Sequence, residues 1–212
     1  MTDLEAICTG VYEDTRKLPQ LTANPALGFE ILMGPPLKRP PIVFIGYQPG
    51  NGSLSVEQAR QAGYEQEWPK TNEYLTASWP LAKRMRRMFG VELLQQCVGL
   101  NAIFVRSRSA HTYVRSLSRH DRRAVRAFCL EEVGKLVRAM DPRLVVVIGF
   151  STLELFGAGT ADLRNHSGRV LTRFGEVHGR RAIATLHLTG SQIANADIDR
   201  IASQVKQYLM NA

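Results

Sequence analysis

Short, unbroken apolar runs constrain the fold of this chain more than any other feature, and residues 144–149 (Leu-Val-Val-Val-Ile-Gly) form the clearest of them. A strand that alternates polar and apolar residues has one face in water, whereas an unbroken apolar run is typical of a parallel strand buried on both faces. Similar runs occur at residues 41–46, 100–105 and 181–186, and residues 170–174 form a weaker one. The chain is therefore predicted to build its core on a parallel sheet.

Segments with helical patterns separate these runs. They span residues 3–18, 55–62, 80–88, 118–140, 151–156 and 194–210, and Gly90 is expected to close the third. Strands that alternate with helices build a parallel sheet covered on both faces. We therefore expect an α/β fold: a three-layer α/β/α sandwich with a mostly parallel central sheet of four or five strands. No repeat or linker interrupts the 212 residues, so we expect one domain, with residues 1–40 as a helical N-terminal extension and residues 41–191 as the motif-bearing core.

The charge and the hydropathy pattern limit the classes of partner. The formal net charge of +8 favours a polyanionic partner, either nucleic acid or, more weakly, an anionic membrane surface. No apolar run approaches the roughly 18 residues of a membrane-spanning helix, and the acidic start of the chain lacks the pattern of a signal peptide. We expect a cytoplasmic, monomeric protein that does not use a membrane.

Cysteine and histidine usage gives no sign of a cofactor. Cys8, Cys97 and Cys129 form no Cys-x-x-Cys pair and leave an odd count, which fits a reducing compartment and argues against disulfides or a cysteine-built zinc site. His166 and His178 have no partners at the spacing of metal ligands. Neither of the glycine-rich nucleotide-binding fingerprints occurs. No metal and no other cofactor is therefore expected.

Polar side chains fall at the ends of three of the predicted strands. Gln48 lies in a Gly/Pro turn after the first strand, Asn101 lies beside the second, and His187 follows the last. Ligands of open α/β sheets bind just beyond the carboxyl ends of parallel strands, so these three side chains are expected to converge. Each residue alone also has an ordinary interpretation, as part of a tight turn, as a strand cap or as a loop histidine.

Three segments together carry a resemblance to a known family. Residues 46–50 (Gly-Tyr-Gln-Pro-Gly) resemble the first active-site motif of the uracil-DNA glycosylase superfamily, a Gly-x-polar-Pro-Gly turn. Residues 100–105 resemble the strand whose Asn binds the flipped uracil, and residues 187–191 resemble the second motif, usually His-Pro-Ser. Residues 145–149 resemble a further core strand, so the likeness extends in order from residue 41 to residue 191. It implies a uracil-DNA glycosylase-like fold and a hydrolase that cleaves N-glycosidic bonds.

The resemblance also implies a reaction and a role for each motif. The enzyme would flip uracil or a related deaminated base out of damaged DNA and excise it by hydrolysis, as in base excision repair. Asn101 would read the base, His187 would stabilise the negative charge on the leaving base, and Gln48 would position the water. We further expect Trp68 to stack on the base, although an ordinary core tryptophan is an equal alternative. Tyr47 and Gly50 would line the pocket, and Thr189, Gly190 and Ser191 would hold the DNA backbone.

Two positions, Gln48 and Leu188, depart from the family pattern, and Gly50 bears separately on the choice of base. Other members carry Asp, Glu or Asn where this chain has Gln48, and an amide can orient water but cannot take its proton. We therefore expect slow turnover, activity restricted to good leaving groups, or none. Leu188 replaces the Pro of the second motif, which removes a fixed φ beside His187. Gly50 replaces the Tyr that excludes thymine in the most uracil-selective members, so we expect a pocket that accepts 5-substituted uracils or other deaminated bases.

Arginines follow the Asn101 strand. Arg106 and Arg108 lie in a Ser-rich loop and are expected to contact DNA phosphates, which position a duplex without reading its sequence. The arginines of residues 119–126 and the basic cluster of residues 83–87 have the alternative interpretation of solvent-exposed helix faces.

Two other functions remain open from the sequence. One is a non-catalytic module that binds DNA or a base in the same pocket. The other is a nucleoside or nucleotide hydrolase that uses the same edge of the sheet.

Overall fold

The side chains of the central strands point alternately into two layers of helices. In a computed structural model that describes residues 2–23, 28–50, 56–107, 117–189 and 193–211, Val43 and Ile45 pack in one core cluster, whereas Ile42 and Phe44 pack in the other. This alternation arises because successive side chains of a strand point to opposite faces. The protein has an α/β fold, and its layers are compatible with the expected three-layer α/β/α sandwich.

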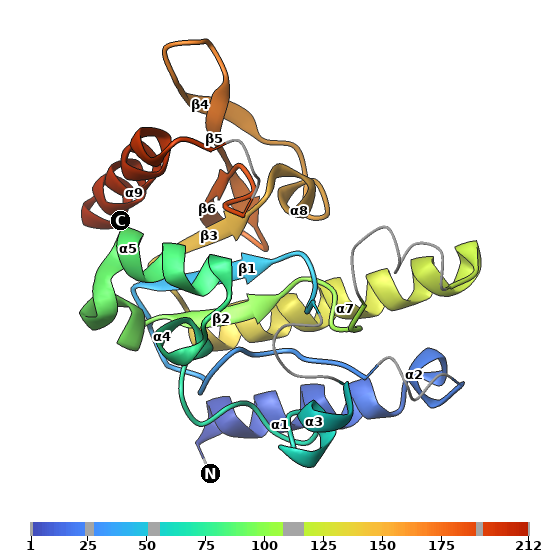
Figure 1. Cartoon of the computed structure of the whole chain (residues 1–212). Helices are drawn as coiled ribbons and strands as arrows, with labels where there is room; N and C mark the ends of the chain where they lie inside the picture. Colours follow the sequence, from blue (N-terminus) through green and yellow to red (C-terminus); the bar gives the residue numbers. More distant parts are fainter. Residues whose placement is uncertain (1, 24–27, 51–55, 108–116, 190–192, 212) are drawn as a thin grey trace.

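Four parallel strands, β2 (Val98–Asn101), β1 (Ile42–Gly46), β3 (Leu144–Ile148) and β6 (Arg180–Thr185), form one side of the sheet (Figure 1). Strand β1 lies between β2 and β3, and β3 pairs on its other side with β6. All three of these pairings are parallel, as the unbroken apolar runs predicted. The second strand was expected at residues 100–105, but β2 lies earlier, since it begins at Val98 and ends at Asn101.

An antiparallel extension adds two strands, so the sheet is mixed and has six strands where four or five were expected. Strands β5 (Val170–Val177) and β4 (Thr160–Arg164) continue the sheet beyond β6. The hairpin from β5 to β6 turns through His178 and Gly179, whose φ values of 48° and 77° suit a two-residue turn of antiparallel strands. The sequence signal for β4 was absent because most of its side chains are exposed and polar.

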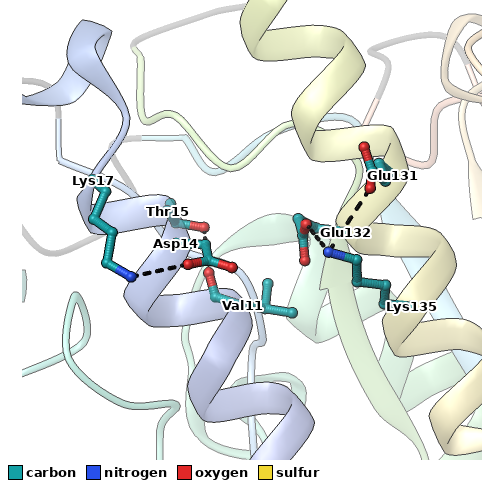
Figure 2. A network of polar contacts seen from close by, with 7 residues as sticks. All are labelled: Val11, Asp14, Thr15, Lys17, Glu131, Glu132 and Lys135. Carbon is teal, nitrogen blue, oxygen red and sulfur yellow. Dashed lines mark hydrogen bonds and ion pairs between the residues drawn. The ribbon is translucent and has the colours of Figure 1, made fainter.

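Helices α1 (Asp3–Arg16) and α7 (Arg119–Met140) pack against each other below one face of the sheet (Figure 1). Figure 2 shows the polar contacts at this junction, where Lys135 of α7 lies 2.6 Å from Glu132 Oε1. Glu132 is nearly fully buried, and its ion pair with Lys135 neutralises a carboxylate that burial would otherwise penalise. On the α1 side, the hydroxyl of Thr15 donates to the carbonyl of Val11.

The opposite face is covered by α5 (Pro80–Gln95) and α9 (Asn195–Met210). Gly90 has a non-helical backbone and ends the first helical segment of α5, as expected, and a second segment continues to Gln95 after the kink. The φ of 75° and ψ of 163° at Gly90 are accessible to glycine without a Cβ clash, so the kink needs no other cause. The remaining helices are short: α2 (Pro19–Ala23), α3 (Val56–Gln61), α4 (Glu73–Thr76) and α8 (Phe150–Leu153).

The segment before β1 contributes to the wall of the sheet edge. Leu32 and Phe29 form isolated antiparallel bridges with Leu100 and Val105, and the amide of Glu30 donates to the carbonyl of Phe104 at 2.9 Å. These contacts place Glu30 beside the carboxyl end of β2. None of the described helices has the length and apolarity needed to cross a membrane.

Candidate functional site

A cavity of about 710 Å³ lies at the carboxyl edge of the parallel strands. Gln48, Asn101 and His187, which follow or end β1, β2 and β6, all line it. Gly46 and Asn101 are register partners at the ends of β1 and β2, so their backbones lie side by side at the cavity. The structure thus brings together the three side chains that the sequence placed at strand ends.

The turn that carries Gln48 is held by the chain that leaves β2. The amides of Ala102 and Ile103 donate to the carbonyls of Gly46 and Tyr47, each at 2.8 Å. The side-chain amide nitrogen of Gln48 donates to the hydroxyl of Ser107. Its Oε1 is buried and has no hydrogen-bond partner among the described residues, so an acceptor at the cavity wall is left for a water or another donor.

Asn101 is fixed beside this turn, at the end of β2. Its side chain is only 3% exposed, and its Nδ2 donates to the backbone carbonyl of Glu30 at 3.3 Å. Its own amide donates to the carbonyl of Ile31 at 3.0 Å. A carboxamide has two N–H donors and one oxygen acceptor, so the bond to Glu30 leaves one donor and the acceptor to meet a ligand.

His187 is held in one tautomer by Thr189. The backbone amide of Thr189 donates to Nδ1 at 3.4 Å, and the Thr189 hydroxyl lies 2.8 Å from the same atom. Because a backbone amide can only donate, Nδ1 carries no proton and the proton sits on Nε2. Partial burial of the ring also lowers the pKa of His187 below its usual 6.5. At neutral pH the side chain is therefore a neutral imidazole with an N–H donor at Nε2.

Leu188, which replaces the expected proline, anchors this segment in another way. Its side chain is 1% exposed and packs in the core cluster with Ile198 of α9. A proline would fix the backbone next to His187 through its φ angle. Leu188 instead holds the backbone there through burial of its apolar side chain.

The structure places two of the other expected residues differently. Trp68 is not among the residues that line the cavity; its ring packs edge-on against Tyr12 of α1, with 5.9 Å between ring centroids. The core interpretation therefore describes Trp68 better than the stacking interpretation. Trp79, which the sequence did not single out, lines the cavity instead, and its Nε1 is buried without a partner among the described residues.

Arg106 was expected to contact DNA phosphates, but its side chain is only 5% exposed. Its Nη2 lies 2.8 Å from Glu30 Oε2, and its Nη1 donates to the carbonyl of Gly50 at 3.2 Å. The guanidinium is thus held inside the cavity wall, where it neutralises Glu30 and supports the Gly50 turn. A buried and paired guanidinium is not on the surface that a DNA backbone would contact.

A pair of carboxyl groups in the cavity was missed by the sequence reasoning. Glu30 and Glu73 both line the cavity and share a hydrogen bond. Burial raises the pKa of both groups, and the neighbouring charge of Glu30 helps to raise that of Glu73 to about 8. The available signal was an acidic residue inside the apolar stretch Phe-Glu-Ile-Leu-Met of residues 29–33, since a charged residue there must be paired or protonated.

The remaining expected residues divide into two groups. Tyr47, Gly50 and Thr189 line the cavity. Arg108, Gly190 and Ser191 lie outside the described residues. Among the described residues, no group of three or more His, Cys, Asp or Glu side chains could hold a metal ion.

The basic residues of the two helices differ in their environments. Arg119, Arg123 and Arg126 are exposed on the N-terminal half of α7, which projects past the ends of β1 and β2 (Figure 1). In α5, by contrast, Arg86 donates to the carbonyls of residues 74 and 77, and Arg87 pairs with Asp199 at 3.1 Å. The α7 arginines are thus the better candidates for phosphate contacts.

No protein-family model matches the chain, and no curated protein matches it. The functional assignment therefore rests on the cavity, its side chains and the three sequence motifs that meet there.

Proposed function

We propose that the protein is a DNA glycosylase with a uracil-DNA glycosylase-like fold, which flips uracil or a related deaminated base out of DNA and excises it by hydrolysis. The observation that carries the proposal is the convergence of Gln48, Asn101 and His187 on one cavity at the carboxyl edge of the sheet. These are the same three residues that carry the resemblance to the superfamily motifs. Each has a distinct part in the reaction.

Asn101 reads the base. Its free amide N–H can donate to O4 of uracil, and its oxygen can accept from N3–H, whereas cytosine presents the opposite pattern at these positions. The bond from Nδ2 to the carbonyl of Glu30 fixes the orientation of the amide before a base enters. Such preorganisation favours discrimination because a mismatched base would leave buried polar groups unpaired.

His187 stabilises the leaving base. When the N-glycosidic bond breaks, its electron pair passes to uracil and negative charge gathers on O2. The neutral imidazole, held by Thr189 with its proton on Nε2, can donate to that oxygen. Loss of one such preorganised donor commonly costs about 100- to 1,000-fold in rate.

Gln48 orients the water that attacks the sugar carbon. Its buried Oε1 can accept a hydrogen bond from a water, and Ser107 holds the other end of the amide. The amide cannot accept the proton that the water must lose, so the proposed turnover is slow. Trp79 takes the stacking role that we expected of Trp68, and the exposed arginines of α7 supply phosphate contacts.

The proposal is tested by abasic-site formation on single- and double-stranded oligonucleotides that carry uracil, hypoxanthine or xanthine. The wild-type protein should generate abasic sites, and Gln48→Ala, Asn101→Ala and His187→Ala should each lower the rate, His187→Ala by about 100-fold. His166→Ala is the matched control, because His166 is exposed in the loop between β4 and β5.

Two outcomes would replace the proposal. Binding of uracil-containing DNA without abasic sites would indicate a non-catalytic binding module. Release of bases from free nucleosides but not from oligonucleotides would indicate a nucleoside hydrolase.

A further inference from the structure

The reaction above leaves one titratable group of the cavity without a role, the carboxyl group of Glu73. Glu73 is the first residue of α4, and its amide donates to the carbonyl of Met33 at 2.8 Å. Asn72, which precedes it, is buried and donates through Nδ2 to the carbonyls of Leu94 and Cys97 at 2.9 and 3.0 Å. These bonds fix the start of α4, so the position of Glu73 in the cavity wall is built into the fold.

Glu73 is joined to a buried ion pair. Its carboxyl group shares a hydrogen bond with that of Glu30, whose Oε2 lies 2.8 Å from Nη2 of Arg106. Burial raises the pKa of Glu30, but the guanidinium of Arg106, which is in contact with Glu30, opposes this effect and favours the negative charge on Glu30 over Glu73. The proton of the shared hydrogen bond then belongs to Glu73, which donates it to Glu30.

The charged and titratable neighbours of Glu73 together keep its carboxyl group protonated. Burial and the charge of Glu30 raise the pKa of Glu73 to about 8, and Arg106 lowers it by a smaller amount. The two neighbouring phenols, Tyr64 and Tyr74, have raised pKa values, so both are uncharged at neutral pH. Glu73 is therefore mostly un-ionised at neutral pH.

The carboxyl pair lies beside the residue that reads the base. Asn101 donates to the backbone carbonyl of Glu30, whereas His187 follows β6, which is separated from β2 by β1 and β3. Three strand spacings amount to about 14 Å across the sheet. Glu73 thus approaches a bound base from the Asn101 side of the cavity, and His187 approaches it from the other.

We propose that Glu73 is a catalytic acid that protonates the leaving base, and that it extends the substrate range to deaminated purines such as hypoxanthine. The proposal rests on the glycosylase function. Uracil can leave as an anion that a neutral imidazole stabilises, but a purine leaves more easily after protonation of a ring nitrogen. Gly50, whose lack of a side chain leaves the cavity open, is compatible with the larger base.

The step balances around the carboxyl pair. The bond between C1′ and the purine nitrogen breaks, its electron pair passes to the base, and the proton of Glu73 adds to a ring nitrogen of the base. Arg106 and Glu30 remain paired, the hydrogen bond from Glu73 to Glu30 is lost with the proton, and the charge of Arg106 stabilises the new carboxylate of Glu73. A water oxygen then bonds to C1′, and the proton that it loses returns to Glu73, which restores the starting state.

The test compares single-turnover excision of hypoxanthine and of uracil from otherwise identical single-stranded oligonucleotides between pH 6 and pH 9. Only the protonated acid can act, so the ratio of the hypoxanthine rate to the uracil rate should fall as the pH rises through about 8, the pKa of Glu73. Glu73→Gln, which keeps the shape but has no proton to transfer, should lower the ratio about 100-fold at pH 7 and abolish its pH dependence. Glu73→Asp should keep the pH dependence.

Glu176→Gln is the matched control. Glu176 is exposed in β5, opposite Arg181 in the register of β5 and β6 and away from the carboxyl ends of the parallel strands, and the substitution should leave the ratio and its pH dependence unchanged. If the wild-type protein excises uracil but the ratio of the hypoxanthine rate to the uracil rate does not vary between pH 7 and pH 9, the role of Glu73 is overturned and the glycosylase function is not. An equal loss for both bases in Glu73→Gln would also overturn that role. Excision of no base by the wild-type protein would overturn the glycosylase function as well.

Discussion

Glu30 and Arg106 form a buried ion pair, with 2.8 Å between Oε2 and Nη2, although they lie far apart in the sequence. The pair joins the segment before β1 to the chain that leaves β2, and Arg106 also donates to the carbonyl of Gly50. It therefore ties three separate segments to one wall of the cavity. Its geometry governs both the stability of the fold and the protonation state of Glu73.

Arg106→Met should be strongly destabilising. It keeps much of the apolar stem but leaves the Glu30 carboxylate buried without a countercharge, which costs about 3–5 kcal/mol. The free energy of unfolding, measured with urea at pH 7, should fall by this amount, whereas Arg119→Met on the exposed start of α7 should change it little. Burial raises the pKa of Glu30 above the usual carboxyl range, so in the variant its protonation removes the unpaired charge and the deficit should shrink as the pH falls. A deficit that does not depend on pH would argue against the ion pair.

Gln48→Glu should accelerate uracil excision by about tenfold or more. The carboxylate can still be held by the hydroxyl of Ser107, and it adds the base that the amide lacks. Single-turnover rates at pH 7 measure the effect, with Gln95→Glu on α5 as a control for the added charge. An unchanged or slower rate would show that deprotonation of water does not limit the reaction.

The two tryptophans should separate stability from ligand binding. Trp68→Ala removes a ring that packs on Tyr12 and should lower the free energy of unfolding by about 3 kcal/mol. Trp79→Ala removes a cavity wall and should weaken the binding of uracil-containing DNA by about 10- to 100-fold, since stacking on a base contributes about 1–3 kcal/mol. Urea denaturation and fluorescence anisotropy distinguish the two effects. The reverse pattern would restore Trp68 as the stacking residue.

Gly50→Tyr should narrow the substrate range. Gly50 lines the cavity, so a large side chain there would crowd a substituent at C5 of the base. Excision of 5-substituted uracils should be lost selectively relative to uracil. Measured rates on a matched set of oligonucleotides decide the matter, and an equal loss for all bases would reject the steric explanation.

His187 should titrate below 6.5 with its proton on Nε2. Burial lowers the pKa of the folded group, so the unfolded chain binds the proton more tightly and stability should decrease as the pH falls below 6.5. Nitrogen NMR of the imidazole measures both the tautomer and the pKa. Thr189→Val, which removes the hydroxyl beside Nδ1, should increase the fraction of the other tautomer and slow excision. A charged imidazole at pH 7 would contradict this description of the donor.

The strands that could be predicted are those whose local pattern of apolar residues indicates burial on both faces. The runs at residues 42–45 and 144–148 are apolar throughout because both faces of these strands are buried, and the structure pairs them as parallel neighbours. The pattern of β4 is polar and exposed, and the direction of β5 depends on a two-residue turn at His178 and Gly179. Neither feature has a strong signal in composition, so the antiparallel edge was missed.

The sequence by itself determined the order of the strands along the chain and put Gln48, Asn101 and His187 at their ends, because strand ends follow from local patterns of apolar and turn-forming residues. Only the tertiary structure decided which side chains complete the cavity. Burial changed Arg106 from an expected phosphate contact into the partner of Glu30, gave Glu73 a raised pKa and put Trp79 in place of Trp68. The physical reason is that protonation, ion pairing and stacking depend on neighbours brought together by folding, and local sequence does not specify those neighbours.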